Sequence, residues 1–196
     1  MFYEFARGLT RAYYKSLYRL EAKGRENIPA AGPVILCANH TSNHDPLVLA
    51  IPLKRQVNFM AKAELFGVPL LGPIIKRLGA FPVKRGGVSK ESIKHSIELL
   101  RSGKVITIFP EGSRSNAGGA GKKGAAMLAL RSQATVIPAA IIGSYRPFRK
   151  MTVIYGEPVD LKESEEAGSD QLEVATEKIM AAIRKMVTTH EKLGKN

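Results

Sequence analysis

Residues Val34–Pro46 read VILCANHTSNHDP. The first five are apolar, a run typical of a short strand buried on both faces. The polar run NHTSNHD follows, and Asp45-Pro46 has the form of a helix N-cap with proline at the first helical position, opening a helix through about Leu53. A strand, a polar loop and a helix in succession indicate an α/β unit with its reactive groups at the strand end.

The same arrangement recurs along the chain. Strands are expected at Val57–Ala61, Ala80–Val83, Val105–Phe109, Thr135–Ile142 and Met151–Tyr155. Helices are expected from Ser89, a candidate N-cap, to Gly103, from about Gly121 to Gln133, and around Leu172–Met186. The apolar segment Leu65–Ile75 is broken by two Gly and two Pro. The pattern predicts the α/β class: a single domain whose mostly parallel sheet is flanked by helices.

Composition excludes several other classes. A length of 196 residues predicts one domain, and 44% hydrophobic with 24% charged residues is ordinary for a packed core. No apolar run approaches the roughly 20 residues that span a bilayer. The first residues, MFYEFARGLTRAYYK, carry charges where a signal peptide would be apolar, so none is expected. One cysteine, Cys37, cannot form an intramolecular disulfide, and no metal site is predicted.

The net charge is the unusual property of this chain. It is +13 at pH 7, from 30 basic and 17 acidic side chains, and residues 161–196 are close to neutral. The excess therefore belongs to the domain itself rather than to a basic tail. Such a surplus indicates an anionic partner: nucleic acid, an acidic membrane surface or a phosphorylated substrate.

Residues 1–23 have the pattern of an amphipathic helix at a membrane interface, with the remainder, 24–196, forming the main domain. One stripe is basic and recurs every four positions: Arg7, Arg11, Lys15, Arg19 and Lys23. Another follows steps of three and four and is apolar: Phe2, Phe5, Leu9, Tyr13, Leu17 and Leu20. The alternative is a surface helix that packs this apolar stripe on the domain and leaves the basic residues solvated.

His40 and Asp45 are the candidate catalytic pair. If the turn brings them together, the carboxylate accepts the Nδ1 proton of His40 and stabilises the imidazolium that forms when Nε2 takes a proton. The alternative is that Asp45 only caps its helix while His40 is an exposed loop residue. His44 is the rival base, although its position next to Asp45 makes it harder for that carboxylate to orient.

No nucleophile accompanies this pair. Neither Ser42 nor Ser113 lies in a G-x-S-x-G elbow, and Cys37 is expected inside a buried strand, where a thiol is inert. A His–Asp pair without a nucleophile suits activation of a hydroxyl group on a bound substrate.

Two further strand ends carry candidate anion-binding groups. Arg85 and Arg114 could hold a phosphate through paired hydrogen bonds, with Lys84 and Lys62 adding positive charge. Each is otherwise a solvated surface residue. The glycines at 118–121 do not form a P-loop and no GxGxxG follows a strand, so no nucleotide cofactor is expected.

Four blocks of sequence, in order, resemble the 1-acyl-sn-glycerol-3-phosphate acyltransferases of the glycerolipid acyltransferase superfamily, over about residues 30–145. They are Asn39–Asp45 (NHTSNHD), Gly79–Arg85 (GAFPVKR), Phe109–Ser115 (FPEGSRS) and Val136–Ile141 (VIPAAI). One departure is Ser113, where the family commonly has Thr.

The resemblance implies a role for individual residues. It makes His40 the catalytic base and Asp45 its partner. Arg85, Glu111, Gly112 and Arg114 fall at acceptor-binding positions, with Lys84 and Lys62 beside them, and Pro138 belongs to an apolar lining. For the oxyanion, backbone N–H groups near the His40 turn are the candidates.

The implied reaction transfers a fatty acyl group from acyl-CoA or acyl-carrier protein to the sn-2 hydroxyl of lysophosphatidic acid, giving phosphatidate. It needs no cofactor or metal. The implied partners are the lysophospholipid and acyl thioester, acyl-carrier protein and an anionic membrane surface. The expected location is the cytoplasmic face of the cell membrane, as a peripheral protein.

Three alternatives remain at this stage. An acyltransferase of the same superfamily could act on another lysolipid or on glycerol 3-phosphate. The domain could instead bind lipid without catalysis. A basic nucleic-acid-binding domain would also explain the charge, but four of the six tyrosines lie at positions 3–18 and no RNP, KH, zinc or helix-turn-helix signature is present, so no nucleic-acid partner is expected.

Overall fold

In the residues that the computed structural model describes, 2–83, 89–112 and 121–194, seven strands form one sheet in the order β1-β7-β6-β2-β5-β3-β4. The strands are β1 (Glu21–Lys23), β2 (Val34–Ala38), β3 (Val57–Lys62), β4 (Ala80–Val83), β5 (Val105–Ile108), β6 (Thr135–Gly143) and β7 (Met151–Tyr155). Neighbours are parallel except β6 and β7, whose connection, residues 144–150, is too short for a crossover.

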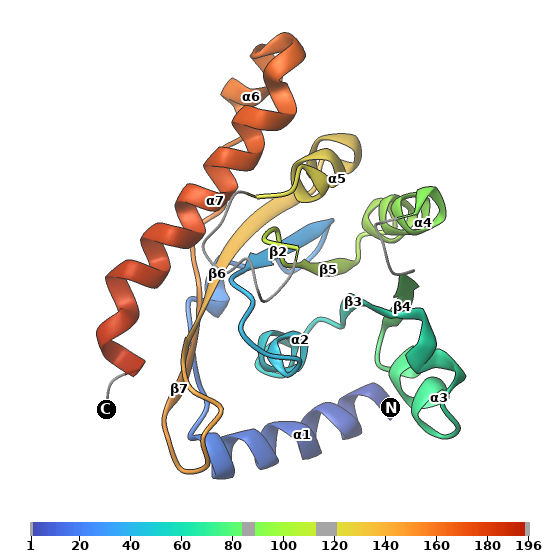
Figure 1. Ribbon diagram of the computed structural model, residues 1–196, viewed down its shortest axis with the longest axis vertical. Coiled ribbons are helices and arrows are strands. Elements are labelled where there is room, and N and C mark those ends of the chain that lie inside the picture. The colour runs from blue at the N-terminus through green and yellow to red at the C-terminus, as the bar shows by residue number, and fades with distance from the viewer. Residues whose placement is uncertain (1, 84–88, 113–120, 195–196) are drawn as a thin grey trace.

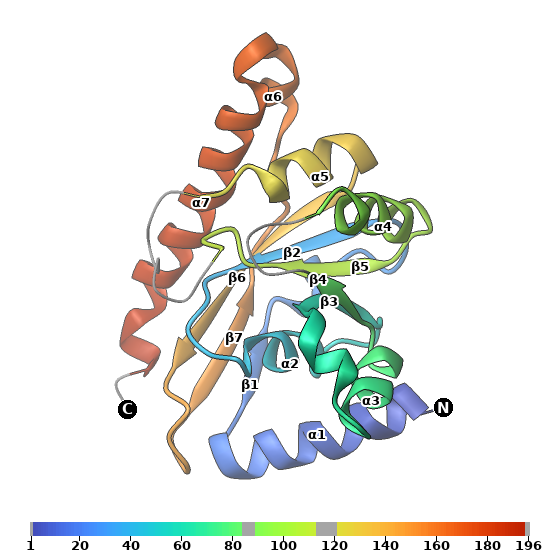
Figure 2. The same ribbon diagram turned by 45° about the vertical axis from the view of Figure 1, so that its right-hand side comes forward.

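Helices cover both faces of this sheet (Figures 1 and 2). The α-helices are α1 (Phe2–Tyr18), α2 (Asp45–Ala50), α3 (Leu71–Arg77), α4 (Lys90–Arg101), α5 (Gly124–Ser132), α6 (Lys162–Glu166) and α7 (Gln171–His190). Short 3-10 helices are η1 (Arg25–Asn27), η2 (Ala63–Gly67), η4 (Gly168–Asp170) and η5 (Glu191–Gly194). Helices α1 and α2 lie on one face, and α4, α5 and α7 on the other.

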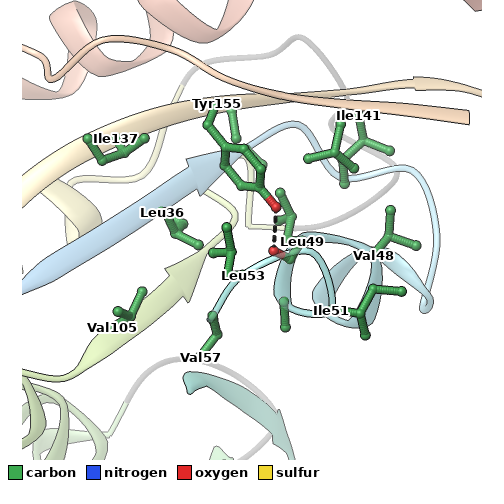
Figure 3. Packing of buried hydrophobic residues seen from close by; sticks show 14 of the residues in the cluster. Leu36, Val48, Leu49, Ile51, Leu53, Val57, Val105, Ile137, Ile141 and Tyr155 are labelled. Atoms are coloured by element: carbon green, nitrogen blue, oxygen red, sulfur yellow. Dashed lines mark hydrogen bonds between the residues drawn. The ribbon is translucent and has the colours of Figure 1, made fainter. Parts of the chain in front are cut away.

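Strand β2 shows how the sheet divides the core in two. All five of its residues are buried, and because successive side chains point to opposite faces, Leu36 packs toward α1 and α2 while Ile35 packs toward α5 and α7. Figure 3 shows the first of these clusters, in which the Tyr155 hydroxyl donates a hydrogen bond to the Leu49 carbonyl at 2.7 Å. This bond connects α2 to β7.

Much of the predicted sequence of strands and helices is confirmed. Strands β2, β4 and β7 have the predicted bounds, and the mostly parallel α/β sheet is present. The Ser89 side chain accepts the Ser92 N–H, as expected of an N-cap, and α4 is followed by Gly103 in the left-handed region. The broken segment Leu65–Ile75 forms η2 and α3.

The prediction that Asp45 caps its helix is wrong. Asp45 is the first residue of α2, His44 is the N-cap without a side-chain cap bond, and the helix ends at Ala50 rather than near Leu53. The Asp45 carboxylate instead turns back toward the preceding loop, whose donors outcompete the helix N–H groups for it.

The N-terminal helix is shorter than predicted. It ends at Tyr18, Arg19 takes a positive φ of 45°, and residues 21–23 form β1 in the sheet, so Lys23 does not extend a helical stripe. Arg7 is not a free surface charge either, because its guanidinium donates to the carbonyls of Leu53 and Lys54 at 2.8 and 2.7 Å.

Helix α1 does not pack its apolar stripe on the domain, as the alternative of a surface helix required. Tyr14 and Tyr18 are its buried residues. Four of the six side chains in the apolar stripe are exposed: Phe2, Phe5, Leu9 and Tyr13. The outer side of α1 therefore carries apolar side chains as well as exposed cations such as Arg11 and Lys15. No helix in the described ranges combines the length and the hydropathy that a membrane crossing requires.

Gly24 should be among the least replaceable residues of the fold. Its φ is +72°, and an added Cβ would collide with the carbonyl oxygen of Tyr155. Gly32, with a φ of +81° and open space around it, is the matched control. We expect Gly32→Ala to lower the free energy of unfolding by about 1–2 kcal/mol, the cost of the left-handed backbone. In urea denaturation, Gly24→Ala should lower the free energy of unfolding by clearly more than Gly32→Ala does. Equal losses would contradict the close approach of Gly24 to the Tyr155 carbonyl.

Candidate active site

The loop between β2 and α2 brings the candidate catalytic pair together. His40 Nδ1 lies 2.8 Å from Asp45 Oδ2, with Asp45 fully buried and 19% of the His40 side chain exposed. Because an ionised carboxylate only accepts, Nδ1 carries the proton and Nε2 has its lone pair free. Among the described residues, none makes a hydrogen bond to Nε2. The arrangement is that of a base with its orienting partner.

Several donors converge on Asp45. Its Oδ2 also accepts the backbone N–H groups of Thr41 at 2.6 Å and Ser42 at 2.7 Å, and Oδ1 accepts the Tyr145 hydroxyl at 2.5 Å. Burial alone would raise the pKa of this carboxyl, but the hydrogen bonds from His40, Tyr145, Ser42 and Thr41 outweigh it and lower the pKa below its ordinary value. Asp45 therefore stays ionised at neutral pH.

His40 is also held from two other sides. Its ring stacks on Phe109 just beyond β5, with centroids 4.1 Å apart, and its backbone N–H donates to Glu111 Oε2 at 3.1 Å. Glu111 is only 3% exposed. These contacts join the loop after β2 to the loop after β5, as expected of neighbouring parallel strands.

The backbone of the His40 turn is largely occupied. The N–H groups of His40, Thr41 and Ser42 donate to the carboxylates of Glu111 and Asp45. The oxyanion donors were expected among the backbone N–H groups near this turn, and these three donate to the carboxylates instead.

His44, the rival base, is engaged elsewhere. Its Nδ1 makes a short hydrogen bond with the Tyr14 hydroxyl from α1. Burial, and then the neighbouring Tyr18, Tyr13 and Asp45, raise the pKa of Tyr14, so its hydroxyl keeps the proton and donates. The imidazole that hydrogen-bonds to the Asp45 carboxylate is that of His40 and not that of His44.

The remaining predicted site residues are placed as follows. Lys62 is exposed at the end of β3. Gly112 is exposed and has a φ of +74°, and a Cβ added there would meet the side chain of Lys122. Pro138 is buried in β6 beside Cys37, and Gly156 packs against it. Lys84, Arg85 and Arg114 lie outside the described residues, as does Ser113, so the phosphate site they were predicted to form stays a prediction.

Cys37 behaves as the sequence indicated. It is fully buried in β2, and burial raises the pKa of its thiol to about 12. A thiol in that state is not a nucleophile at neutral pH.

Sequence reasoning missed two contacts that hold the loop. The Asn39 side chain pairs with the backbone of Ile141, accepting its N–H at 2.8 Å and donating to its carbonyl at 3.1 Å, which extends the contact between β2 and β6 past Ala38. Tyr145 reaches Asp45 from the connection after β6. Asn39 could have been noticed as the first polar residue after the strand; nothing near Tyr145 in sequence signals its contact.

The fold and the site together define a class: an α/β protein whose mostly parallel sheet carries, at the end of β2, a histidine oriented by a buried carboxylate. Comparison with known proteins specifies it further. A family model described as Acyltransferase matches residues 19–142. The chain belongs to this family and is an acyltransferase.

Named relatives agree with this assignment. The 1-acyl-sn-glycerol-3-phosphate acyltransferase of Bacillus subtilis is 36% identical over 141 residues, 69% of this chain and 71% of that protein. The chloroplastic LPAT1 enzyme of Arabidopsis thaliana, described by the same activity, is 32% identical over 65% of this chain and 37% of its own length. The crystal structure of the 1-acyl-sn-glycerophosphate (LPA) acyltransferase PlsC from Thermotoga maritima matches with a TM-score of 0.70 and 26% identity, covering 94% of this chain and 78% of that one.

The charge of Asp45 should make the fold sensitive to acid. Its pKa is lowered in the folded state, so its stabilisation is present above the ordinary value of 3.8 and is lost as the pH falls through the folded-state pKa. We expect Asp45→Asn to reduce the free energy of unfolding by about 1–3 kcal/mol at pH 7, because the amide cannot accept from all these donors. The difference from wild type should shrink below pH 4 in urea titrations.

Asp160→Asn, the same replacement at an exposed side chain, controls for the general effect of pH on the fold. A difference between wild type and Asp45→Asn that is the same at pH 7 and pH 3 would show that the carboxylate charge does not stabilise the loop.

Proposed function

We propose that this acyltransferase transfers a fatty acyl group from a thioester to the sn-2 hydroxyl of 1-acyl-sn-glycerol 3-phosphate, giving phosphatidate for phospholipid synthesis. The observation that carries the proposal is the His40–Asp45 pair at 2.8 Å. Among the described residues, no nucleophilic side chain makes a hydrogen bond to Nε2 of His40. The relatives named for this activity support the choice of acceptor.

The reaction follows from the orientation of His40. Nε2 takes the proton from the acceptor hydroxyl as its oxygen attacks the thioester carbonyl, and Asp45 stabilises the imidazolium that forms. When the tetrahedral intermediate collapses, the carbon–sulfur bond breaks and the leaving thiolate takes the proton from His40. Base catalysis of this kind contributes about 10²–10⁴ in rate.

The second substrate is acyl-CoA or acyl-carrier protein, and the mechanism needs no further cofactor. For the acceptor phosphate, we assign Arg85, Arg114 and Lys84, with Lys62 at the end of β3, on the resemblance of their sequence blocks. Another lysolipid or glycerol 3-phosphate is the alternative acceptor. A panel of these acceptors with purified protein and labelled acyl-CoA distinguishes them, since only the preferred one should give the highest kcat/KM.

We also propose that the enzyme docks on an anionic membrane through an apolar surface centred on α1. In the described part of the chain, the exposed large apolar side chains come from α1, η2–α3 and the β6–β7 connection: Phe2, Phe5, Leu9, Tyr13, Leu65, Val68, Leu70, Leu71, Ile74 and Phe148. Leu70 is 82% exposed. We call these ten residues the apolar surface.

The three segments are neighbours in space. The Arg77 guanidinium of α3 lies 5.6 Å from the centre of the Phe2 ring, and the Phe148 N–H donates to the Leu17 carbonyl at 2.5 Å. Both views show α3 beside the N-terminal end of α1 and the β6–β7 connection beside its C-terminal end (Figures 1 and 2).

Charge and position favour a lipid bilayer as the occupant. Exposed cations border the apolar surface: Arg11, Lys15, Lys76, Arg77, Arg146 and Arg149. Apolar side chains with a basic border suit an anionic interface. Helix α1 also contacts the active-site loop through Tyr14 and His44, so docking here would bring the dyad to the lipids. A peripheral position at the cytoplasmic face of the cell membrane follows as a prediction.

The first test of the activity is His40→Ala. We expect kcat to fall by about 10²–10⁴, because the lost group is the base, while circular dichroism still shows the native fold. The free energy of unfolding should fall by about 1–3 kcal/mol, since His40 also donates a hydrogen bond to buried Asp45. His190→Ala, which removes an imidazole from the last turn of α7, is the control and should keep full activity. A His40→Ala variant with wild-type turnover would remove His40 from the mechanism.

Membrane binding is tested by point substitutions, since deleting residues 1–23 would also remove β1. We expect Phe5→Ser with Leu9→Ser to weaken co-sedimentation with phosphatidylglycerol vesicles, because both side chains are exposed and apolar. Leu70→Ser with Leu71→Ser should have a similar effect. Phosphatidylcholine vesicles should bind wild type more weakly. Unchanged binding by both double variants would place the membrane contact elsewhere.

A further inference from the structure

Tyr145 approaches the dyad from a distant part of the chain. It follows β6 by two residues, in the connection to β7, and its hydroxyl donates to Asp45 Oδ1 at 2.5 Å. Burial, and then the hydrogen bond to Asp45 and its charge, raise the pKa of Tyr145. The phenol therefore remains protonated at neutral pH and acts as a donor.

The two oxygens of Asp45 are held by different groups. Oδ2 accepts hydrogen bonds from the His40 ring and from the backbone N–H groups of Thr41 and Ser42, all within 2.8 Å. Among the described residues, Oδ1 accepts hydrogen bonds from the Tyr145 hydroxyl at 2.5 Å and from the Thr41 hydroxyl at 3.3 Å. Tyr145 is thus the strongest donor on that side, and it limits rotation of the carboxylate about its Cβ–Cγ bond. That rotation decides whether Oδ2 stays in line with His40 Nδ1.

The Tyr145 ring is fixed independently of its hydroxyl. It lies against the His44 ring with centroids 5.3 Å apart and meets the edge of Tyr18 at 6.0 Å. Tyr14 contacts His44 from α1. A phenylalanine at position 145 can keep these ring contacts and lose only the hydrogen bond to Asp45.

We propose that Tyr145 is a positioning residue for the proposed acyl transfer, which holds the Asp45 carboxylate so that His40 is kept in the basic tautomer and orientation. It acts through Asp45 and does not exchange a proton itself. The proposal rests on the proposed function for its kinetic consequences, but its geometric consequence at His40 does not depend on the identity of the substrate.

Loss of the Tyr145 hydroxyl should change both rate and pH dependence. A freer carboxylate orients His40 less well, so we expect Tyr145→Phe to lower kcat about 5- to 50-fold with KM within about twofold of wild type. Without the Tyr145 hydroxyl, one donor fewer shares the charge of Asp45, which then stabilises the imidazolium more strongly, so the acid limb of kcat/KM should move to higher pH. The other titratable groups facing these side chains from the described elements are Glu111, His44, Tyr14 and Tyr18.

Tyr155→Phe is the matched control. Its hydroxyl donates to Leu49 of α2, the same helix that carries Asp45, and it does not contact the dyad. The control removes the same atom from a buried tyrosine and should lower stability without moving the pH profile. An acid limb displaced equally in both variants would overturn the proposal. So would a Tyr145→Phe variant whose kcat and pH profile are unchanged, or one in which only KM changes.

Two further measurements separate positioning from folding and from the choice of substrate. In the Asp45→Asn background, Tyr145→Phe should have little additional effect on turnover per folded molecule, since it acts through the missing carboxylate; additive effects would contradict it. NMR of the His40 ring nitrogens should show a smaller share of the Nδ1-protonated tautomer in Tyr145→Phe than in wild type, without any substrate. If wild type fails to acylate lysophosphatidate, the proposed function fails, while an unchanged tautomer ratio would refute the positioning role.

Discussion

The active-site loop depends on one buried carboxylate. Asp45 has no exposed surface, and an ionised group in that position is tolerated only when donors replace the water that it loses. The backbone amides of Thr41 and Ser42, the His40 ring and the Tyr145 hydroxyl supply these donors. The same hydrogen bonds that satisfy the charge set the path of the loop and the tautomer of the histidine, so the stability of the loop and its chemistry have one origin.

Helix α1 places this loop next to an apolar outer surface. The inner side of the helix contributes Tyr14, which binds His44 one residue before Asp45, and Tyr18, which contacts Tyr145. The outer side presents Phe5 and Leu9 to the surroundings. A single helix therefore separates the proposed lipid interface from the dyad, which suits an enzyme whose proposed acceptor and product are both lipids.

The sequence could predict those parts of the fold that depend on local chemistry. The apolar run Val34–Ala38 gives β2 with the predicted bounds, and Ser89 caps α4, because both depend on residues within a few positions. Which face of α1 packs on the domain could not be predicted, for the opposite reason. Apolar and tyrosine side chains occur all around this helix, so periodicity could not decide between Tyr14 and Tyr13 as the buried residue.

The sequence by itself determined the α/β class, the strand end that bears the reactive groups and the pairing of His40 with Asp45, five positions apart in one loop. Only the tertiary structure decided which groups satisfy Asp45 and hold the loop. Tyr145 is 100 residues from Asp45, and Ile141 is 102 residues from Asn39. These contacts exist because β6 lies beside β2 in the sheet, and the strand order that makes them neighbours is set by the packing of the whole domain rather than by any local pattern.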